Sequence, residues 1–137
     1  PRTMSLQPDH IDLPAVRAEV LAEFERYEAA LMANDVQALN DFFWCDPRVT
    51  RYGIGDRQLG HEALVRYRAS VPAPDFTRAL WRVRIHTFGP DVAVAQCEFT
   101  RSDTPLHGFQ TQTWARMAEG WKIVAAHVSM VPPFPDP

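Results

Sequence analysis

The sequence predicts an α+β domain, with helices in its first half and a curved, mostly antiparallel sheet in its second half. Two observations predict this class. Apolar residues recur at helical spacing up to about residue 70, and they alternate with polar residues over long stretches from about residue 77. Glycine and proline separate these stretches and do not interrupt them. We therefore expect three helices packed inside one wrapped sheet, with an internal pocket between them.

The composition fits one domain and excludes several classes of function. Lys and Arg number 14 against 17 Asp and Glu in 137 residues, a formal net charge of -3, so no nucleic-acid-binding surface is expected. No apolar run approaches the roughly 20 residues of a membrane helix, and two cysteines make no disulfide framework. We expect a cytoplasmic protein with a single domain at residues 4–131, after a tag remnant at residues 1–3 and before a proline-rich tail at residues 132–137.

Three helices are expected before the sheet. Pro14 opens the longest one, at a position where its missing N–H costs no hydrogen bond. Asp35 ends this helix together with Asn34 and caps a short second helix over residues 36–43. Gly60 opens the third, which ends at the prolines near residue 72. The inward residues are expected to be Val16, Val20, Phe24, Tyr27 and Leu31 on the first helix, and Leu64, Val65 and Tyr67 on the third.

Six strands are expected. A hairpin at residues 49–52 and 57–59 turns through two glycines, and four longer strands follow, at residues 77–87, 92–100, 108–117 and 121–131. Unbroken alternation along the first and last of these strands turns Trp81, His127 and Ser129 inward. The alternation does not show which face of the strand at residues 108–117 lines the pocket.

No known catalytic or metal-binding motif is present. The sequence holds no His-Glu-x-x-His, no Cys-x-x-Cys, no phosphate-binding glycine loop and no dinucleotide fingerprint. The five histidines have no metal-ligand spacing, so we expect neither a metal nor a cofactor. Any chemistry must come from side chains that the fold brings together in a pocket.

Two residues stand out as candidates for that chemistry. Tyr27 lies in the apolar stripe of the first helix, so its phenol points into the domain, either bonded to a backbone carbonyl or acting as an acid in the pocket. Arg51 shares the face of Val49 on a short strand, and it either leans into solvent or points inward. Since no nearby acid is an obvious partner, an inward Arg51 would await a carboxylate ligand, which its planar guanidinium binds through two hydrogen bonds.

Further residues are candidates for the pocket wall because each falls on a face predicted to point inward. For His127, a place on the pocket floor and a role as general base both stay open. These substrate-binding candidates are Tyr67, Trp81, Phe99, Gln112, Trp114, His127 and Ser129. On the outer face of the sheet, a polar surface suited to a homodimer interface is expected from Arg82, Arg84, Gln96 and Glu98.

The order of elements resembles a known fold. Two helices, a hairpin, a third helix and four long strands that end in Gly-Trp-Lys-Ile-Val-x-x-His-x-Ser resemble the SnoaL-like cone, the fold of ketosteroid isomerase and nuclear transport factor two. This fold carries isomerases, cyclases, dehydratases and adaptors, so it does not by itself decide the function. Ketosteroid isomerase chemistry would need an inward carboxylate base, and none is expected.

Particular segments between residues 11 and 130 resemble the AtzH/HpxZ family, small SnoaL-like proteins of cyanuric acid and oxalurate catabolism. These segments are FERYEAAL at residues 24–31, ND at 34–35, FW at 43–44, RYGIG at 51–55, GH at 60–61, TFG at 87–89, EFTR at 98–101, QTQTW at 110–114 and GWKIVAAHVS at 120–129.

The resemblance implies a cofactor-independent enzyme. For the AtzH branch it implies decarboxylating amide hydrolysis of 1,3-dicarboxyurea to allophanate, with Tyr27 and Arg51 at the positions of the functional pair. It also implies a functional link to an amidase-signature hydrolase. The alternative is a non-catalytic accessory module that binds a small anionic carboxyurea or docks onto the amidase.

Overall fold

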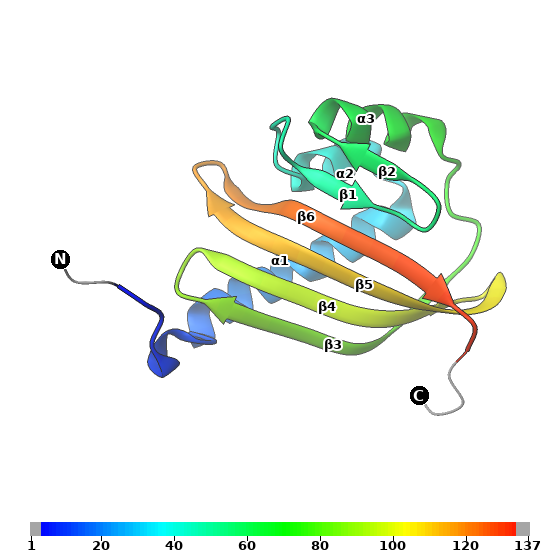
Figure 1. The fold of residues 1–137 in the computed structure, drawn as a ribbon. Helices are drawn as coiled ribbons and strands as arrows, with labels where there is room; N and C mark the ends of the chain where they lie inside the picture. The colour runs from blue at the N-terminus through cyan, green and yellow to red at the C-terminus, as the bar shows by residue number, and fades with distance from the viewer. Residues whose placement is uncertain (1–3, 134–137) are drawn as a thin grey trace.

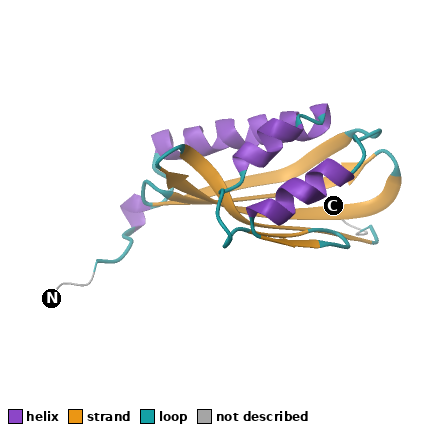
Figure 2. Cartoon of the chain, turned by 90° about the horizontal axis from the view of Figure 1, so that it is seen from above, coloured by secondary structure: helices purple, strands orange, loops and turns teal. Residues whose placement is uncertain are grey.

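Helix α1 (Pro14–Ala33) lies along one face of a six-stranded sheet in the computed structural model, which describes residues 4–133 (Figures 1 and 2). Pro14 stands in the first turn, as predicted, and Asn34 ends the helix in the left-handed conformation with φ of 53°. A short 3-10 turn, η1 (Pro8–His10), precedes it. Every third or fourth residue of α1 is buried against the sheet: Val16, Val20, Phe24, Tyr27 and Ala30.

The second and third helices cover the same side of the domain. Helix α2 (Val36–Phe42) is capped by Asp35, whose carboxylate accepts a hydrogen bond of 3.2 Å from the backbone N–H of Ala38. Helix α3 (His61–Ser70) buries Leu64 and Arg68, which are one turn apart. The prediction that Val65 points inward is wrong, because the buried stripe continues from Leu64 to Arg68 and leaves Val65 exposed.

The sheet has the strand order β2-β1-β6-β5-β4-β3. All neighbouring strands are antiparallel except β1 and β6, which run parallel and place Arg51 beside Ala126. The hairpin of β1 and β2 is therefore joined to the long strands only through β6 (Figure 1). The six strands are β1 (Thr50–Tyr52), β2 (Arg57–Leu59), β3 (Arg78–Phe88), β4 (Val92–Arg101), β5 (Thr104–Met117) and β6 (Gly120–Val131).

Two irregularities change which side chains face the helices. In β3 the register shifts between Trp81 and Arg84, and the residue between them, Arg82, has a positive φ of 48°. In β6 the pairing moves from Ile123 directly to Ala125, so one extra residue is inserted there. A bulge of this kind reverses the face of every residue beyond it, so a simple alternation cannot hold along these strands.

The hydrophobic core lies between the helices and the inner face of the sheet, where Phe24, Trp114 and Ile123 are fully or almost fully buried. The opposite face of the sheet is not covered by helices. It faces the viewer in Figure 1, where α1 lies behind the sheet. Among residues 4–133, no helix is long and apolar enough to cross a membrane. The predictions for residues 1–3 and for most of the tail lie outside the described residues.

Candidate active site

A cavity of about 310 Å³ lies between α1, α3 and the inner face of the sheet. Tyr27 and Leu31 line it from α1, Arg51 lines it from β1, and Tyr67 and Arg68 line it from α3. The loop that follows α3 closes a further side, and the last part of the wall comes from β3 to β6. The cavity thus brings together the two residues that the sequence singled out for chemistry.

Tyr27 is buried, with 5% of its surface exposed, yet its hydroxyl has no hydrogen-bond partner within residues 4–133. The ring packs edge-on against Phe42 and Phe43, with centroid distances of 5.6 and 6.2 Å. A buried phenol normally finds a partner in the protein. The interpretation of Tyr27 as a core tyrosine bonded to a backbone carbonyl is therefore wrong, and its hydroxyl can serve a molecule in the cavity.

Arg51 points inward, with 11% of its side chain exposed. Its Nη1 donates hydrogen bonds of 2.9 Å to Asp56 Oδ1 and to Gln58 Oε1, and Gln58 Nε2 donates one of 2.9 Å to the same oxygen of Asp56. Asp56 lies five residues along the chain, so the expectation that no nearby acid pairs with Arg51 is wrong. The network occupies Nη1 only, which leaves the Nε–Nη2 edge without a partner in the described part of the chain and open to a carboxylate.

The same network affects the ionisation of Asp56. Partial burial raises the pKa of this carboxyl, but the hydrogen bond from Gln58 and the charge and hydrogen bond of Arg51 outweigh burial and hold the pKa below its ordinary value of 3.8. Asp56 is consequently ionised at neutral pH and keeps Arg51 in place.

Two further arginines of the cavity are also paired with carboxylates. Arg78 donates to Glu28 at 2.6 and 3.3 Å, and its guanidinium carbon lies 4.1 Å from the centre of the Phe99 ring. Arg101 donates to Asp103 at 2.6 and 2.9 Å. Glu28 is therefore engaged in an ion pair and is not a free base of the kind that isomerase chemistry would need.

Arg68 is different, because it lines the cavity with 8% of its surface exposed and has no carboxylate partner within residues 4–133. Its guanidinium contacts the Tyr67 ring, whose centre lies 5.7 Å from the guanidinium carbon. Sequence reasoning missed Arg68. The helical spacing from Leu64 would have found it, since the two residues are separated by one turn.

The other predicted wall residues divide into three groups. Tyr67 and Phe99 line the cavity. Gln112 and Trp114 are in the core outside it, where the indole N–H donates to the Gln112 carbonyl at 3.1 Å. Trp81, which is 50% exposed, and the pair His127 and Ser129 lie away from the cavity. The bulges in β3 and β6 reverse the faces on which these three were predicted, so their placement in the wall is corrected.

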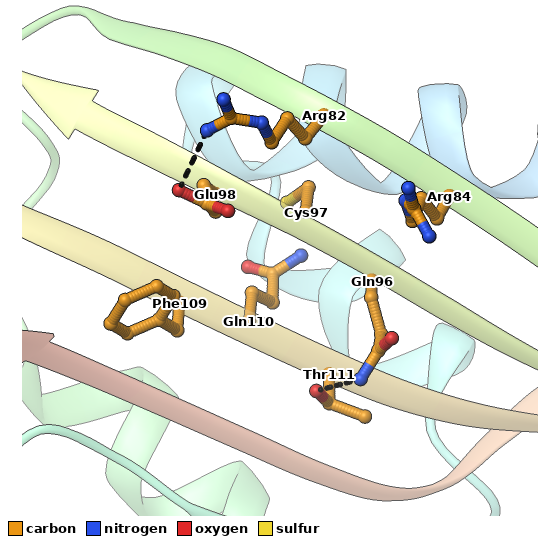
Figure 3. A pocket seen from close by; sticks show the side chains of 8 residues that line it. All are labelled: Arg82, Arg84, Gln96, Cys97, Glu98, Phe109, Gln110 and Thr111. Atoms are coloured by element: carbon orange, nitrogen blue, oxygen red, sulfur yellow. Dashed lines mark hydrogen bonds and ion pairs between the residues drawn. The ribbon is translucent and has the colours of Figure 1, made fainter. Parts of the chain in front are cut away.

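The open face of the sheet carries a second hollow, of about 360 Å³ (Figure 3). The residues expected to face outward do line it: Arg82, Arg84, Gln96 and Glu98. Gln96 donates to the Thr111 hydroxyl at 3.1 Å, and Arg82 lies 3.7 Å from Glu98. This hollow is wide and its charged groups are partly solvated, whereas the inner cavity holds the Tyr27 hydroxyl, which has no hydrogen-bond partner among residues 4–133, and the buried Arg68, which has no carboxylate partner there. The inner cavity is the candidate active site.

No group of three His, Cys, Asp or Glu residues in the described ranges is placed to hold a metal ion. The side chains that line the cavity offer two kinds of chemistry. Guanidinium groups bind and orient anions, and a phenol can donate a proton.

Comparisons with known proteins agree with this fold. A family model described as AtzH-like matches residues 9–133. A protein of unknown function from Pectobacterium atrosepticum, of the DUF3225 family, is 45% identical, with a TM-score of 0.90 over 93% of this chain and 99% of that one. A cystatin-like fold protein from Burkholderia xenovorans is 44% identical, with a TM-score of 0.88 over 95% and 100%.

A more distant structure, a ketosteroid isomerase-like protein from Erwinia carotovora, is 18% identical with a TM-score of 0.71 over 88% of this chain and all of that one, and it shows the fold alone. A nuclear transport factor 2-like protein from Salmonella enterica, 21% identical, has a TM-score of 0.72 over 88% and 94%. The search of curated proteins found no match.

Proposed function

This chain belongs to the AtzH-like family, and on that premise we propose that it is a cofactor-independent hydrolase of carboxylated ureas. Its reaction is the decarboxylating amide hydrolysis of 1,3-dicarboxyurea to allophanate, in cyanuric acid catabolism. One observation carries the proposal: the same cavity holds the Tyr27 hydroxyl, which has no hydrogen-bond partner among residues 4–133, and an open edge of the Arg51 guanidinium.

The reaction needs an anion-binding group and a proton donor. The bond between one urea nitrogen and its carboxyl carbon breaks, the electron pair stays on nitrogen, and the carboxyl group leaves as carbon dioxide. The nitrogen takes up one proton, so the dianion and one proton give the allophanate monoanion and carbon dioxide. Water then hydrates the carbon dioxide to bicarbonate, which completes the net hydrolysis.

Arg51 and Tyr27 fit these two roles. The open Nε–Nη2 edge of Arg51 binds a substrate carboxylate in a fixed orientation, because Asp56 and Gln58 hold the opposite nitrogen. Tyr27 donates its phenolic proton to the departing nitrogen, and water returns a proton to the phenolate. A preorganised cation next to the reacting groups also stabilises the charge that develops on the urea.

The test measures carbon dioxide release and allophanate formation from freshly generated 1,3-dicarboxyurea, above the spontaneous rate. We expect the wild type to accelerate both, and Arg51→Ala and Tyr27→Phe to lose the acceleration. The controls are Arg57→Ala and Tyr52→Phe. They change an arginine and a tyrosine at exposed positions of the hairpin that carries Arg51, outside the cavity. If none of these proteins exceeds the uncatalysed rate, the substrate assignment is wrong.

The same experiment separates the enzyme from an accessory module that acts beside an amidase. An enzyme converts many molecules of substrate per cavity, whereas an accessory module binds a carboxyurea and returns it unchanged. To distinguish the two, substrate is added repeatedly in excess over the protein and the product is measured. Only an enzyme forms more product than there are cavities. Co-purification with an amidase-signature hydrolase, in the absence of turnover, would favour the accessory module.

A homodimer or higher homo-oligomer through the open sheet face is part of the proposal. Exposed Trp81 and the charged pair of Arg82 and Glu98 on this face support it, since apolar and complementary charged groups suit a self-complementary interface. We expect sedimentation equilibrium to give a multiple of the 15.6 kDa chain mass. Trp81→Asp should shift the protein toward the monomer, and a monomeric wild type would contradict the expectation.

A further inference from the structure

We infer that Arg68 forms a second carboxylate-binding subsite in the cavity, so that the cavity selects dicarboxylates over monocarboxylates. The inference rests on the proposed function for the role of the cavity and names its substrate class more closely. Four arginines line this cavity, and three of them are balanced by a carboxylate within 3 Å: Arg51 by Asp56, Arg78 by Glu28 and Arg101 by Asp103.

Arg68 is the fourth, and among residues 4–133 no carboxylate balances it. An arginine is always charged in proteins, and burying a charge without a partner is costly. The acidic residue that also lines the cavity, Asp75, is exposed and forms no ion pair with Arg68. An anionic ligand would supply the missing partner.

The two guanidinium groups lie close enough to bind one small molecule. The Tyr67 ring centre is 4.9 Å from the guanidinium carbon of Arg51 and 5.7 Å from that of Arg68, so a single aromatic ring contacts both. The cavity of about 310 Å³ is at the small end of the range for ligand sites. A short dianion with a carboxylate at each end matches both the size and the placement of charge.

Gln110 adds a neutral donor to the wall of the same cavity. Its side-chain carbonyl accepts from Arg78 Nη2 at 3.3 Å, which fixes the orientation of the amide, and its Nε2 is buried with no hydrogen-bond partner. The residue is 4% exposed and lines the cavity. An amide N–H₂ that has no partner among residues 4–133 is a donor in the cavity wall that a ligand oxygen would satisfy.

The second subsite has a consequence for product release. 1,3-Dicarboxyurea carries two carboxylates and allophanate carries one. The substrate therefore engages both Arg51 and Arg68, whereas the product loses one of these contacts and binds more weakly. Weaker binding of the product favours its release from the cavity.

The experiment uses stable probes, because 1,3-dicarboxyurea decomposes unaided. Glutarate and 1,3-dicarboxyurea both have a backbone of five atoms, counted from one carboxyl carbon to the other. Pentanoate has the backbone of glutarate with one carboxylate replaced by a methyl group. Titration calorimetry should show that the full-length wild type binds glutarate about tenfold more tightly than pentanoate, as expected for one additional charged hydrogen-bonded contact. Arg68→Gln should abolish this preference, and Arg68→Lys should retain part of it.

The matched control is Arg66→Gln, which removes an exposed arginine from the same helix and should leave the preference unchanged. Thermal unfolding without ligand should show that Arg68→Gln is folded and at least as stable as the wild type, because the substitution removes an unbalanced buried charge. Glutarate should raise the Tm of the wild type and not that of Arg68→Gln.

A preference for glutarate that survives in Arg68→Gln would overturn the subsite, and so would a wild type that binds the two probes equally or binds neither. A wild type that prefers glutarate through Arg68 but does not accelerate the breakdown of 1,3-dicarboxyurea would leave the dicarboxylate subsite standing and contradict only the proposed function.

Discussion

Replacing Tyr27 with phenylalanine removes one oxygen atom and tests the proposed reaction most directly. The ring and its edge contacts with Phe42 and Phe43, at 5.6 and 6.2 Å, are kept. Because the hydroxyl makes no hydrogen bond within residues 4–133, its removal costs no protein hydrogen bond. We expect the free energy of unfolding of Tyr27→Phe to change by less than about 0.5 kcal/mol, below the usual net value of one hydrogen bond.

Turnover should respond very differently. A positioned proton donor contributes about 10²–10⁴-fold to a rate. We expect the rate above the uncatalysed background to fall by at least about 100-fold, which corresponds to about 2.7 kcal/mol in the activation free energy. Carbon dioxide release measures this rate, and chemical denaturation measures stability in the same preparation.

Tyr27→Leu provides the contrast. It loses both aromatic edge contacts, which are worth about 0.5–1.5 kcal/mol each, so it should lose stability as well as turnover. The reasoning is refuted if Tyr27→Phe keeps the wild-type rate, because the phenol is then not the proton donor. It is also refuted if Tyr27→Phe loses more than about 1 kcal/mol of stability, because the hydroxyl would then be a structural group.

Three further predictions concern the surroundings of the site. Gly53→Ala should lower both the Tm and turnover, because a Cβ at this position would lie 2.7 Å from Nη1 of Arg51, whereas Gly55→Ala meets nothing within 4 Å and should be neutral. The lowered pKa of Asp56 stabilises the fold above pH 3.8, and this contribution is lost as pH falls further, so the difference in Tm between the wild type and Asp56→Asn should shrink between pH 4 and pH 2. Burial raises the pKa of Cys97 to about 11, so a thiol reagent at pH 8 should label the exposed cysteine quickly and Cys97 only after denaturation.

Each of these has a clear contrary result. Equal activity of the two glycine variants would mean that the ion pair of Arg51 tolerates displacement. A difference in Tm that is constant from pH 7 to pH 2 would show that folding does not lower the pKa of Asp56. Rapid labelling of both thiols in the native state would show that β4 opens readily.

The order of elements and the identity of Tyr27 and Arg51 could be predicted from the sequence, because they depend on local spacing. The apolar residues of α1 recur at three and four residues, which places Tyr27 inward whatever the sheet does. Arg51 follows Val49 by two residues with no bulge between them, so the local pattern allowed an inward Arg51 beside the alternative that leans into solvent, and the structure shows the inward one.

The wall of the cavity was less predictable. Alternation places Trp81 and His127 inward, but a bulge in each strand turns them to the open face, and nothing in the local sequence marks the inserted residue. Arg68 was missed for a different reason, since an arginine on a helix is normally assigned to solvent. Only the position of Leu64 one turn earlier indicates that this arginine is buried.

The parallel pairing of β1 with β6 has a consequence for the order in which the protein can be made. Arg51 belongs to the first half of the chain, yet its strand pairs with the long sheet only beside residues 125–127 of β6, which is made after the other five strands. A nascent chain that ends at β5 can hold α1 and three long strands together, but it lacks β6, the strand with which the hairpin pairs. Tyr27 and Arg51 therefore come together only after β6 has been made, so the cavity should form later than the rest of the sheet.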